Sequence, residues 1–234
     1  MKVHVLWLFL VPVFTALEAA TINQPRALNP LLPCDKLDVI FVLDQTESVG
    51  SKLSDRMKDF AKQVMDRFFV SHEQTHLGLM TFGREARVEG DLQLQQKRSG
   101  RQQMVEKLIE SIPNKLDDRT NLDEGLRMAF NAHAEYDTFQ KKKKYRTDAR
   151  NVVIIFTDGR TYNETRLESL SKPSNGVTVI AIALGLNVFP NVLSRIADVV
   201  IDWTNSDGNE RKETDVLKDI MDNFNFKPCG KTEV

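Results

Sequence analysis

The chain has 234 residues, of which 28% are charged and 41% are hydrophobic, and its formal net charge is −1. This length allows one α/β domain with a full core, or at most two small domains. The near balance of charge excludes a general electrostatic attraction to nucleic acid or to anionic membranes, so we expect neither as a partner.

The first twenty residues have the pattern of a secretory signal peptide. Lys2 gives a positive start, Val5–Leu17 is a nearly continuous apolar core, and the Glu-Ala-Ala at 18–20 supplies a cleavage zone. The apolar core is too short to span a bilayer, and no second such stretch follows it. We therefore expect a secreted, extracellular protein without a membrane span; the alternative is an uncleaved anchor.

The two cysteines lie near the ends of the expected mature chain. Cys34 precedes the first predicted strand, and Cys229 lies close to the last residue. In an oxidising compartment one pair most simply forms one disulfide, which would tie the ends of the domain together and stabilise it by up to about 5 kcal/mol. The alternative is two free or intermolecular cysteines. We expect a leader at 21–34, a domain at 35–229 and a tail at 230–234.

Strands and helices are predicted to alternate along the chain. Short apolar runs rich in β-branched and aromatic residues indicate strands, and apolar residues recurring every three or four positions indicate helices. The predicted strands cover residues 37–43, 76–82, 86–94, 151–157, 176–185 and 199–203. The predicted helices follow apolar stripes at 53–68, 104–112, 122–130, 188–196 and 216–224. This alternation predicts a single α/β domain with a doubly wound, mostly parallel Rossmann-like sheet and helices on both faces.

Side chains that carry oxygen follow two of these strands and precede one helix. Asp44, Thr46 and Ser48 are spaced two apart, so an extended chain would aim their oxygens the same way. Thr120 lies in a polar loop before a helix, and Asp158 ends another apolar strand. Ligands bind at the carboxyl ends of strands in open α/β sheets. Two carboxylates and three hydroxyls suit a six-coordinate Mg²⁺, or Mn²⁺, that can accept a further carboxylate from a partner.

At these residues the chain resembles the von Willebrand factor A domain family, in the style of its secreted matrix proteins. The family's metal-ion-dependent adhesion site has Asp-x-Ser-x-Ser after the first strand, a Thr in a later loop and an Asp that ends the fourth strand. The segment Asp44-Gln45-Thr46-Glu47-Ser48 fits this pattern with Thr for the first Ser, Thr120-Asn121 resembles the Thr loop, and Ile155-Phe156-Thr157-Asp158-Gly159 matches closely. The resemblance covers roughly residues 35–226 and includes terminal cysteines that bridge the domain.

The resemblance implies a secreted, non-enzymatic adhesion module. It would bind an extracellular protein, such as collagen or another matrix component, through a Mg²⁺ or Mn²⁺ ion held by Asp44, Thr46, Ser48, Thr120 and Asp158. A lone domain of this kind gains strength by self-association or works as a soluble ligand. The alternative is a matrix protein of the same fold that binds its partners without a metal.

The chain departs from the family pattern at several positions around the expected metal. Thr46 adds a methyl group, and the usual glycines are missing at Gln45 and Asp123. Glu47 either faces solvent or lies near the ion, where it would compete with the carboxylate of a partner.

A second motif points to different chemistry. His72-Glu73-Gln74-Thr75-His76 matches His-Glu-x-x-His, which binds zinc in proteases only when it lies on a helix. Here the helical stripe ends by Phe69 and a strand is predicted from His76, so a zinc hydrolase is a remote alternative. No nucleophile elbow, phosphate-binding loop or dinucleotide fingerprint is found in the sequence, and we expect no enzyme.

Two surface features complete the sequence-based predictions. Asn163-Glu164-Thr165 is an acceptor for N-glycosylation, and a glycan on Asn163 would stand beside the metal face. The basic run at 141–146 either binds sulfated glycans or acidic partners, or is a solvated loop.

Overall fold

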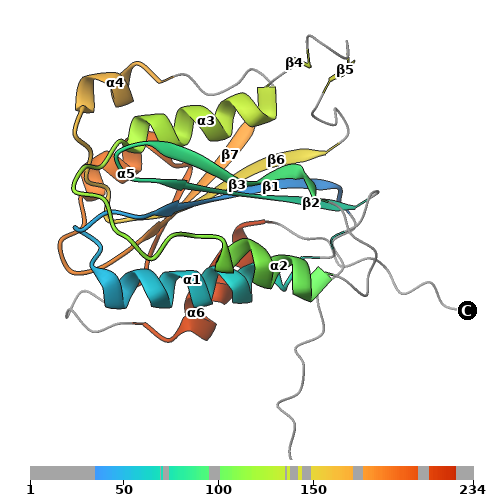
Figure 1. The fold of residues 1–234 in the computed structure, drawn as a ribbon, viewed down its shortest axis with the longest axis horizontal. Helices are drawn as coiled ribbons and strands as arrows, with labels where there is room; N and C mark the ends of the chain where they lie inside the picture. The colour runs from blue at the N-terminus through green and yellow to red at the C-terminus, as the bar shows by residue number, and fades with distance from the viewer. Residues whose placement is uncertain are drawn as a thin grey trace, which may run out of the picture.

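A computed structural model describes residues 35–68, 70, 74–94, 101–134, 136–137, 142–143, 149–170, 176–204 and 211–224 of the protein (Figure 1). The predicted signal peptide, leader and tail, both cysteines, and His72 and Glu73 lie outside these residues. Of the basic run at 141–146, only Lys142 and Lys143 lie within them.

Six strands form the central sheet in the order β3-β2-β1-β6-β7-β8. Only β3 runs antiparallel to its neighbour; the other neighbours are parallel, which confirms the predicted sheet. The strands are β1 (Leu37–Asp44), β2 (Thr75–Phe82), β3 (Ala86–Leu94), β6 (Arg150–Thr157), β7 (Val177–Ala183) and β8 (Val199–Asp202). A separate short pair, β4 (Tyr136–Asp137) with β5 (Lys142–Lys143), was not expected from the sequence.

Helices cover both faces of the sheet (Figure 1). One face carries α1 (Ser51–Met65), α2 (Arg101–Glu110) and α6 (Glu213–Asn223). The other face carries α3 (Leu122–Ala134), α4 (Glu164–Glu168) and α5 (Pro190–Ile196). The sequence predicted all of these helices except α4, which has only five residues and no apolar stripe.

Two apolar cores lie between the sheet and these helices. Because side chains alternate along a strand, Phe41 of β1 packs into the core beneath α1 and Ile40 packs into the core beneath α3. All eight residues of β1 are buried, which explains why its sequence is a continuous apolar run rather than an alternating one. In the first core, the Phe60 ring contacts the Trp203 ring edge-on, with 4.6 Å between the ring centroids.

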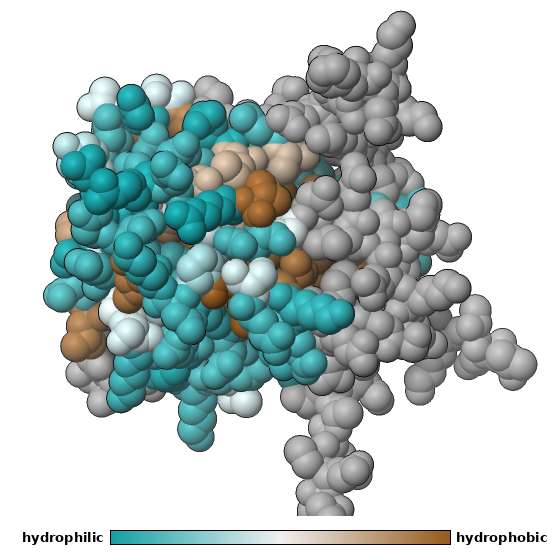
Figure 2. All heavy atoms as spheres, viewed as in Figure 1, coloured by the Kyte–Doolittle hydropathy of each residue, from teal (hydrophilic) through white to brown (hydrophobic). Residues whose placement is uncertain are grey.

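The coloured, described part of the surface offers no wide apolar area on the side that Figure 2 shows. Hydrophilic residues dominate this side, and small apolar groups lie between them. Among the helices of the described residues, none is long and apolar enough to cross a membrane.

The order of the strands determines where a ligand can bind. The chain passes from β1 to β2 on one side of β1, and later places β6 on the other side. The loops after β1 and β6 therefore leave the sheet on opposite sides and open a crevice at the carboxyl ends of these strands. In the β1–β6 register Leu43 lies opposite Phe156, so Asp44 and Thr157 come next to each other.

Candidate metal centre

Asp44 is the buried centre of the predicted oxygen set, which consists of Asp44, Thr46, Ser48, Thr120 and Asp158. Its carboxylate is fully buried at the end of β1. One oxygen, Oδ1, accepts hydrogen bonds from the Thr46 hydroxyl at 2.6 Å and from the Thr46 amide at 3.1 Å. The other, Oδ2, accepts a hydrogen bond from the Thr157 hydroxyl at 2.7 Å. The carboxylate is thereby fixed in position by three donors.

The loop after β1 brings Ser48 back to this carboxylate. The chain turns at residues 47–49 and does not stay extended as the sequence suggested. Even so, the hydroxyl oxygens of Thr46 and Ser48 lie 3.0 Å apart. The Glu47 amide donates to the Asp117 carbonyl at 2.8 Å, which ties the turn to the loop before α3. Asp44, Thr46 and Ser48 thus form one hydrogen-bonded chain of oxygens.

Gln45 occupies a position where the family pattern has glycine. Its side chain is buried, and its Nε2 donates to the Ser54 hydroxyl at 3.3 Å. Its Oε1 finds no hydrogen-bond partner within the described residues. The longer side chain is therefore accommodated beneath α1, and not among the oxygens that could hold a metal.

Thr120 joins the set from the loop before α3. Its carbonyl accepts a hydrogen bond from the Tyr162 amide at 2.8 Å, and the Asn121 amide donates to the Gly83 carbonyl at 2.9 Å. These bonds hold Thr120 between the loop after β2 and the loop after β6. Thr46, Ser48 and Thr120 all line one hollow of about 430 Å³, called the loop hollow below, whose wall includes Glu47, Arg119, Arg160 and Tyr162.

Asp158 lies directly after β6, with 4% of its surface exposed. Its Oδ1 accepts the Arg160 amide at 2.8 Å, and the Arg160 Nε lies 3.6 Å from its Oδ2. The turn requires a left-handed residue at Gly159, whose φ is +82°, and a Cβ there would lie 3.1 Å from the Leu193 side chain. The Arg160 side chain, which sequence reasoning did not single out, is thus the charged neighbour of Asp158.

The electrostatics of these residues favour a bound cation. The pKa of Asp44 is raised to about 7, with burial as the largest cause; the nearby Asp158 also raises it, while hydrogen bonds from Thr46 and Thr157 act in the opposite direction. A divalent ion would offset the cost of keeping both carboxylates ionised. The donors are all hard oxygens, without sulfur or imidazole, and this chemistry fits Mg²⁺ or Mn²⁺. The residues present therefore fit the predicted metal.

Glu47 and Asn163 lie at the edge of this region. Glu47 is exposed at the wall of the loop hollow. Asn163 caps α4, where its Oδ1 accepts a hydrogen bond from the Arg166 amide at 3.1 Å. An Asn followed by an acidic first turn is a helix-start signal, and it could have predicted α4.

The zinc-protease motif does not have its required context where the structure describes it. His76 lies in β2, is buried, and places its Nδ1 3.5 Å from Oδ1 of Asp38. Across the described ranges, no group of three or more His, Cys, Asp or Glu residues is arranged to hold a metal. The oxygen set contains only two such residues, Asp44 and Asp158, and its other three members carry hydroxyls.

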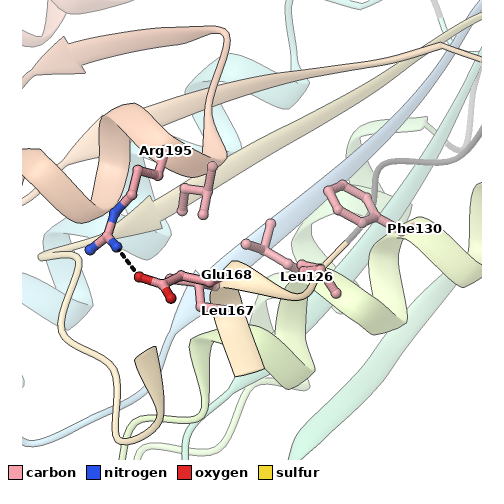
Figure 3. A pocket seen from close by; sticks show the side chains of 7 residues that line it. Leu126, Phe130, Leu167, Glu168 and Arg195 are labelled. Carbon is pink, nitrogen blue, oxygen red and sulfur yellow. Dashed lines mark hydrogen bonds and ion pairs between the residues drawn. The ribbon is translucent and has the colours of Figure 1, made fainter. Parts of the chain in front are cut away.

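A second hollow, of about 190 Å³, lies between α3, α4 and α5 (Figure 3). Leu126, Phe130 and Leu167 give it an apolar wall, and the Arg195 Nη1 pairs with Glu168 Oε1 at 2.6 Å beside it. None of the predicted site residues lines it.

Comparisons with known proteins agree with this fold and identify proteins of similar sequence. A sequence model of the von Willebrand factor type A domain matches residues 38–223. Von Willebrand factor A domain-containing protein 2 of Xenopus laevis is 27% identical over 163 residues, which are 69% of this chain and 19% of that protein. Matrilin-1 of Homo sapiens is 24% identical over 161 residues, 69% of this chain and 31% of that protein. The chain therefore spans less than a third of the length of these relatives.

Solved structures share the arrangement of strands and helices. One crystal form of proximal thread matrix protein 1 from the mussel byssus superposes with a TM-score of 0.63 and 21% identity, over 81% of this chain and 48% of that chain. A structure of the same mussel protein, described as having a zinc-occupied MIDAS motif, gives a TM-score of 0.60 and 22% identity, over 80% and 45%. Because the family's sequence model extends from β1 to the end of α6, this chain belongs to the von Willebrand factor type A domain family.

Proposed function

We propose that this chain is a secreted, non-enzymatic binding module of the extracellular matrix, which engages a protein ligand through a divalent metal at the oxygen set. The observation that carries the proposal is the chain of hydroxyls on Asp44, which leads from a fully buried carboxylate to the loop hollow. Relatives named matrilin and collagen alpha-6(VI) chain support the matrix setting.

The five residues of the oxygen set have different tasks in this proposal. Asp44 and Asp158 would supply the negative charge, and Thr46, Ser48 and Thr120 would supply neutral oxygens, directly or through water. When bound, a Mg²⁺ or Mn²⁺ ion supplies an electron-poor position for a carboxylate of the ligand. Thr157 orients Asp44 through its hydroxyl, and its own oxygen accepts the Gly159 amide at 3.0 Å. No group here needs to act as a nucleophile or a base.

A metal-independent matrix protein is the second candidate, because Arg160 already places a positive charge beside Asp158. The ion pair of 3.6 Å between them could substitute for part of the metal's charge. In that case partner binding would persist in a chelator, whereas our proposal requires that it be lost.

Thermal unfolding of the secreted protein in Mg²⁺, Mn²⁺, Zn²⁺ or chelator tests the proposal. A ligand present at 100 times its Kd stabilises the folded state by about 2.7 kcal/mol, which raises the Tm by roughly 5–10 °C for a domain of this size. We expect this shift with Mg²⁺ or Mn²⁺, and its loss in Asp158→Ala. The matched control is Asp55→Ala, which removes an exposed acid from α1 and should keep the shift.

The result also separates the candidates. A parent protein whose Tm responds to none of the three metals would overturn the metal-dependent function and favour the second candidate. A shift with Zn²⁺ alone that survives in Asp158→Ala would direct attention to His72 and His76.

The disulfide and the glycan remain proposals of their own. We infer a Cys34–Cys229 bridge and a glycan on Asn163, whose Nδ2 makes no hydrogen bond within the part of the chain that the structure describes. Intact-mass measurement before and after reduction with alkylation, and before and after enzymatic deglycosylation, tests both. We expect two alkylated thiols only after reduction, and one glycan that Asn163→Gln abolishes.

A further inference from the structure

The wall of the loop hollow contains two arginines and a tyrosine directly beside the oxygens proposed to hold the metal, and three acids, Glu47, Asp117 and Asp118, line it as well. Thr46, Ser48 and Thr120 line the same hollow as Arg119, Arg160 and Tyr162. A ligand carboxylate that reached the metal would therefore enter a space whose wall already contains two guanidinium groups.

The two arginines of this wall differ in what neutralises them. Arg160 is paired with Asp158, and its guanidinium also lies 5.6 Å from the centre of the Phe189 ring. Arg119 makes no ion pair or hydrogen bond through its side chain within the described residues. Its guanidinium lies 5.5 Å from the centre of the Tyr162 ring instead. Arg119 is thus the arginine of the wall that is available to an incoming anion.

The acid nearest to Arg119 in sequence is already engaged elsewhere. Both oxygens of Asp118 accept hydrogen bonds from the Arg84 guanidinium, at 2.7 and 2.9 Å. Arg84 is thus the main partner of Asp118 and the largest cause of its lowered pKa, and the attraction of Arg119 makes the smallest contribution. Tyr162 is 71% exposed and Arg119 is exposed beside it, so the contact with the ring orients the guanidinium without burying it.

These contacts identify the chemical class of the ligand. We propose that the loop hollow recognises an acidic peptide segment with two nearby carboxylates, one for the metal and one for Arg119; this rests on the proposed function. A planar guanidinium pairs with a carboxylate through two parallel hydrogen bonds. The exposed Tyr162 offers an apolar surface to peptide side chains, which a sulfated sugar chain lacks.

Fluorescence anisotropy with two rhodamine-labelled Gly/Ser decapeptides tests the proposal. One peptide carries a single glutamate and the other carries two glutamates separated by two residues. In Mn²⁺ we expect the parent protein to bind the second peptide about 3- to 10-fold more tightly, the effect of one partly exposed charge-assisted pair. Arg119→Ala should abolish this ratio and keep the affinity for the first peptide and the metal-induced Tm shift.

The controls separate charge loss from loss of the site. Arg67→Ala removes a positive charge just after the end of α1, away from the loop hollow, and should keep the ratio. Tyr162→Phe keeps the ring beside Arg119 and should also keep it, whereas Tyr162→Ala should lower it.

Each outcome bears on one of the two proposals. If chelator and Asp158→Ala leave binding of the single-glutamate peptide unchanged, the proposed function is wrong, and this inference falls with it. If both abolish that binding while Arg119→Ala keeps the ratio, only this inference is wrong. The inference is also overturned if the parent binds neither peptide at ~1 mM. Heparin binding that Arg119→Ala weakens, with an unchanged peptide ratio, would assign Arg119 to sulfate.

Discussion

The two ends of the central sheet both bury ionisable groups, but they do so in different ways. At the carboxyl end, Asp44 is surrounded by hydroxyl and amide donors that lead to the loop hollow. At the amino end, a second group of buried polar residues lies between the sheet and α3, and neighbouring strands supply most of it: Asp38, His76, His133 and Asn151.

The difference shows what distinguishes a binding site from an internal polar network. The pKa of both His133 and Asp44 is displaced by burial, downward to about 4 for the histidine and upward to about 7 for the acid. His133 faces the carbonyl of Val152, at 3.3 Å from its Nε2. At the carboxyl end, hydrogen bonds between hydroxyls continue from Asp44 to an exposed residue, Ser48. Burial alone therefore does not identify a site; a path of ligating oxygens to the surface does.

The largest expected effect comes from Asp44→Asn. The folded-state pKa of Asp44 lies above its ordinary value, so above pH 7 the ionised carboxylate costs free energy that the unfolded state does not pay. An Asn amide can accept from Thr46 and donate to the Thr157 oxygen. In chelator at pH 8, we expect Asp44→Asn to raise the free energy of unfolding by about 2–4 kcal/mol, measured by urea denaturation.

The same variant should lose the Tm shift in Mg²⁺ or Mn²⁺. Asp55→Asn, an exposed change in α1, is the control and should stay within about 0.5 kcal/mol of the parent. If Asp44→Asn were less stable than the parent in chelator, the folded protein would accommodate the ionised Asp44 carboxylate without cost. This result would contradict the prediction.

The second-largest expected effect is on the pH dependence of stability, through His133. Because the folded-state pKa of His133 is lowered from 6.5 to about 4, the unfolded state binds a proton first, and stability is lost as the pH falls through this window. Asp44 acts in the opposite direction between pH 7 and 4, so the two ends partly cancel in chelator. Replacing His133 by Gln keeps a donor for the Val152 carbonyl but removes the titration.

The measurement is urea denaturation at pH 7.5 and pH 5 in chelator. When the pH is lowered from 7.5 to 5, the change in the free energy of unfolding should be about 2 kcal/mol more favourable for His133→Gln than for the parent. Equal changes in the free energy of unfolding of both proteins would contradict this prediction. They would mean that the proton taken up on acid unfolding binds to a group other than His133.

The smallest effect is expected for Glu47→Gln. Glu47 is exposed on the wall of the loop hollow, where water screens its charge. The midpoint of the Mg²⁺ or Mn²⁺ titration, followed by Tm, should therefore change by less than about twofold. A tenfold higher metal concentration at the midpoint would instead indicate that Glu47 takes part in metal binding, in addition to the five predicted residues.

Much of the fold was predictable because its signals are local. The continuous apolar runs of β1 and β6 and the stripes of α1, α3 and α6 lie within single segments. The closeness of Asp44, Thr46 and Ser48 was predictable for the same reason, although the chain turns between them instead of extending.

Contacts between distant segments were not predictable from the sequence. Thr157 was missed because its role depends on the β1–β6 register, and Arg160 because its partner Asp158 was expected to face a metal. The polar residue Asp38 lies inside an apolar strand, and its neighbours His76 and Asn151 come from two other strands. Only the pairing of those strands shows that they form one network.

The hydrogen bond between Thr157 and Asp44 joins residues 113 positions apart and has a consequence for folding kinetics. Parallel pairing of β1 with β6 requires most of the chain to be present, and contacts of such long range form slowly. A nascent chain that has produced β1 but not β6 has Asp44 without its partner, and cannot yet hold an ion tightly. Metal uptake at the proposed site would thus report that the domain has completed its folding.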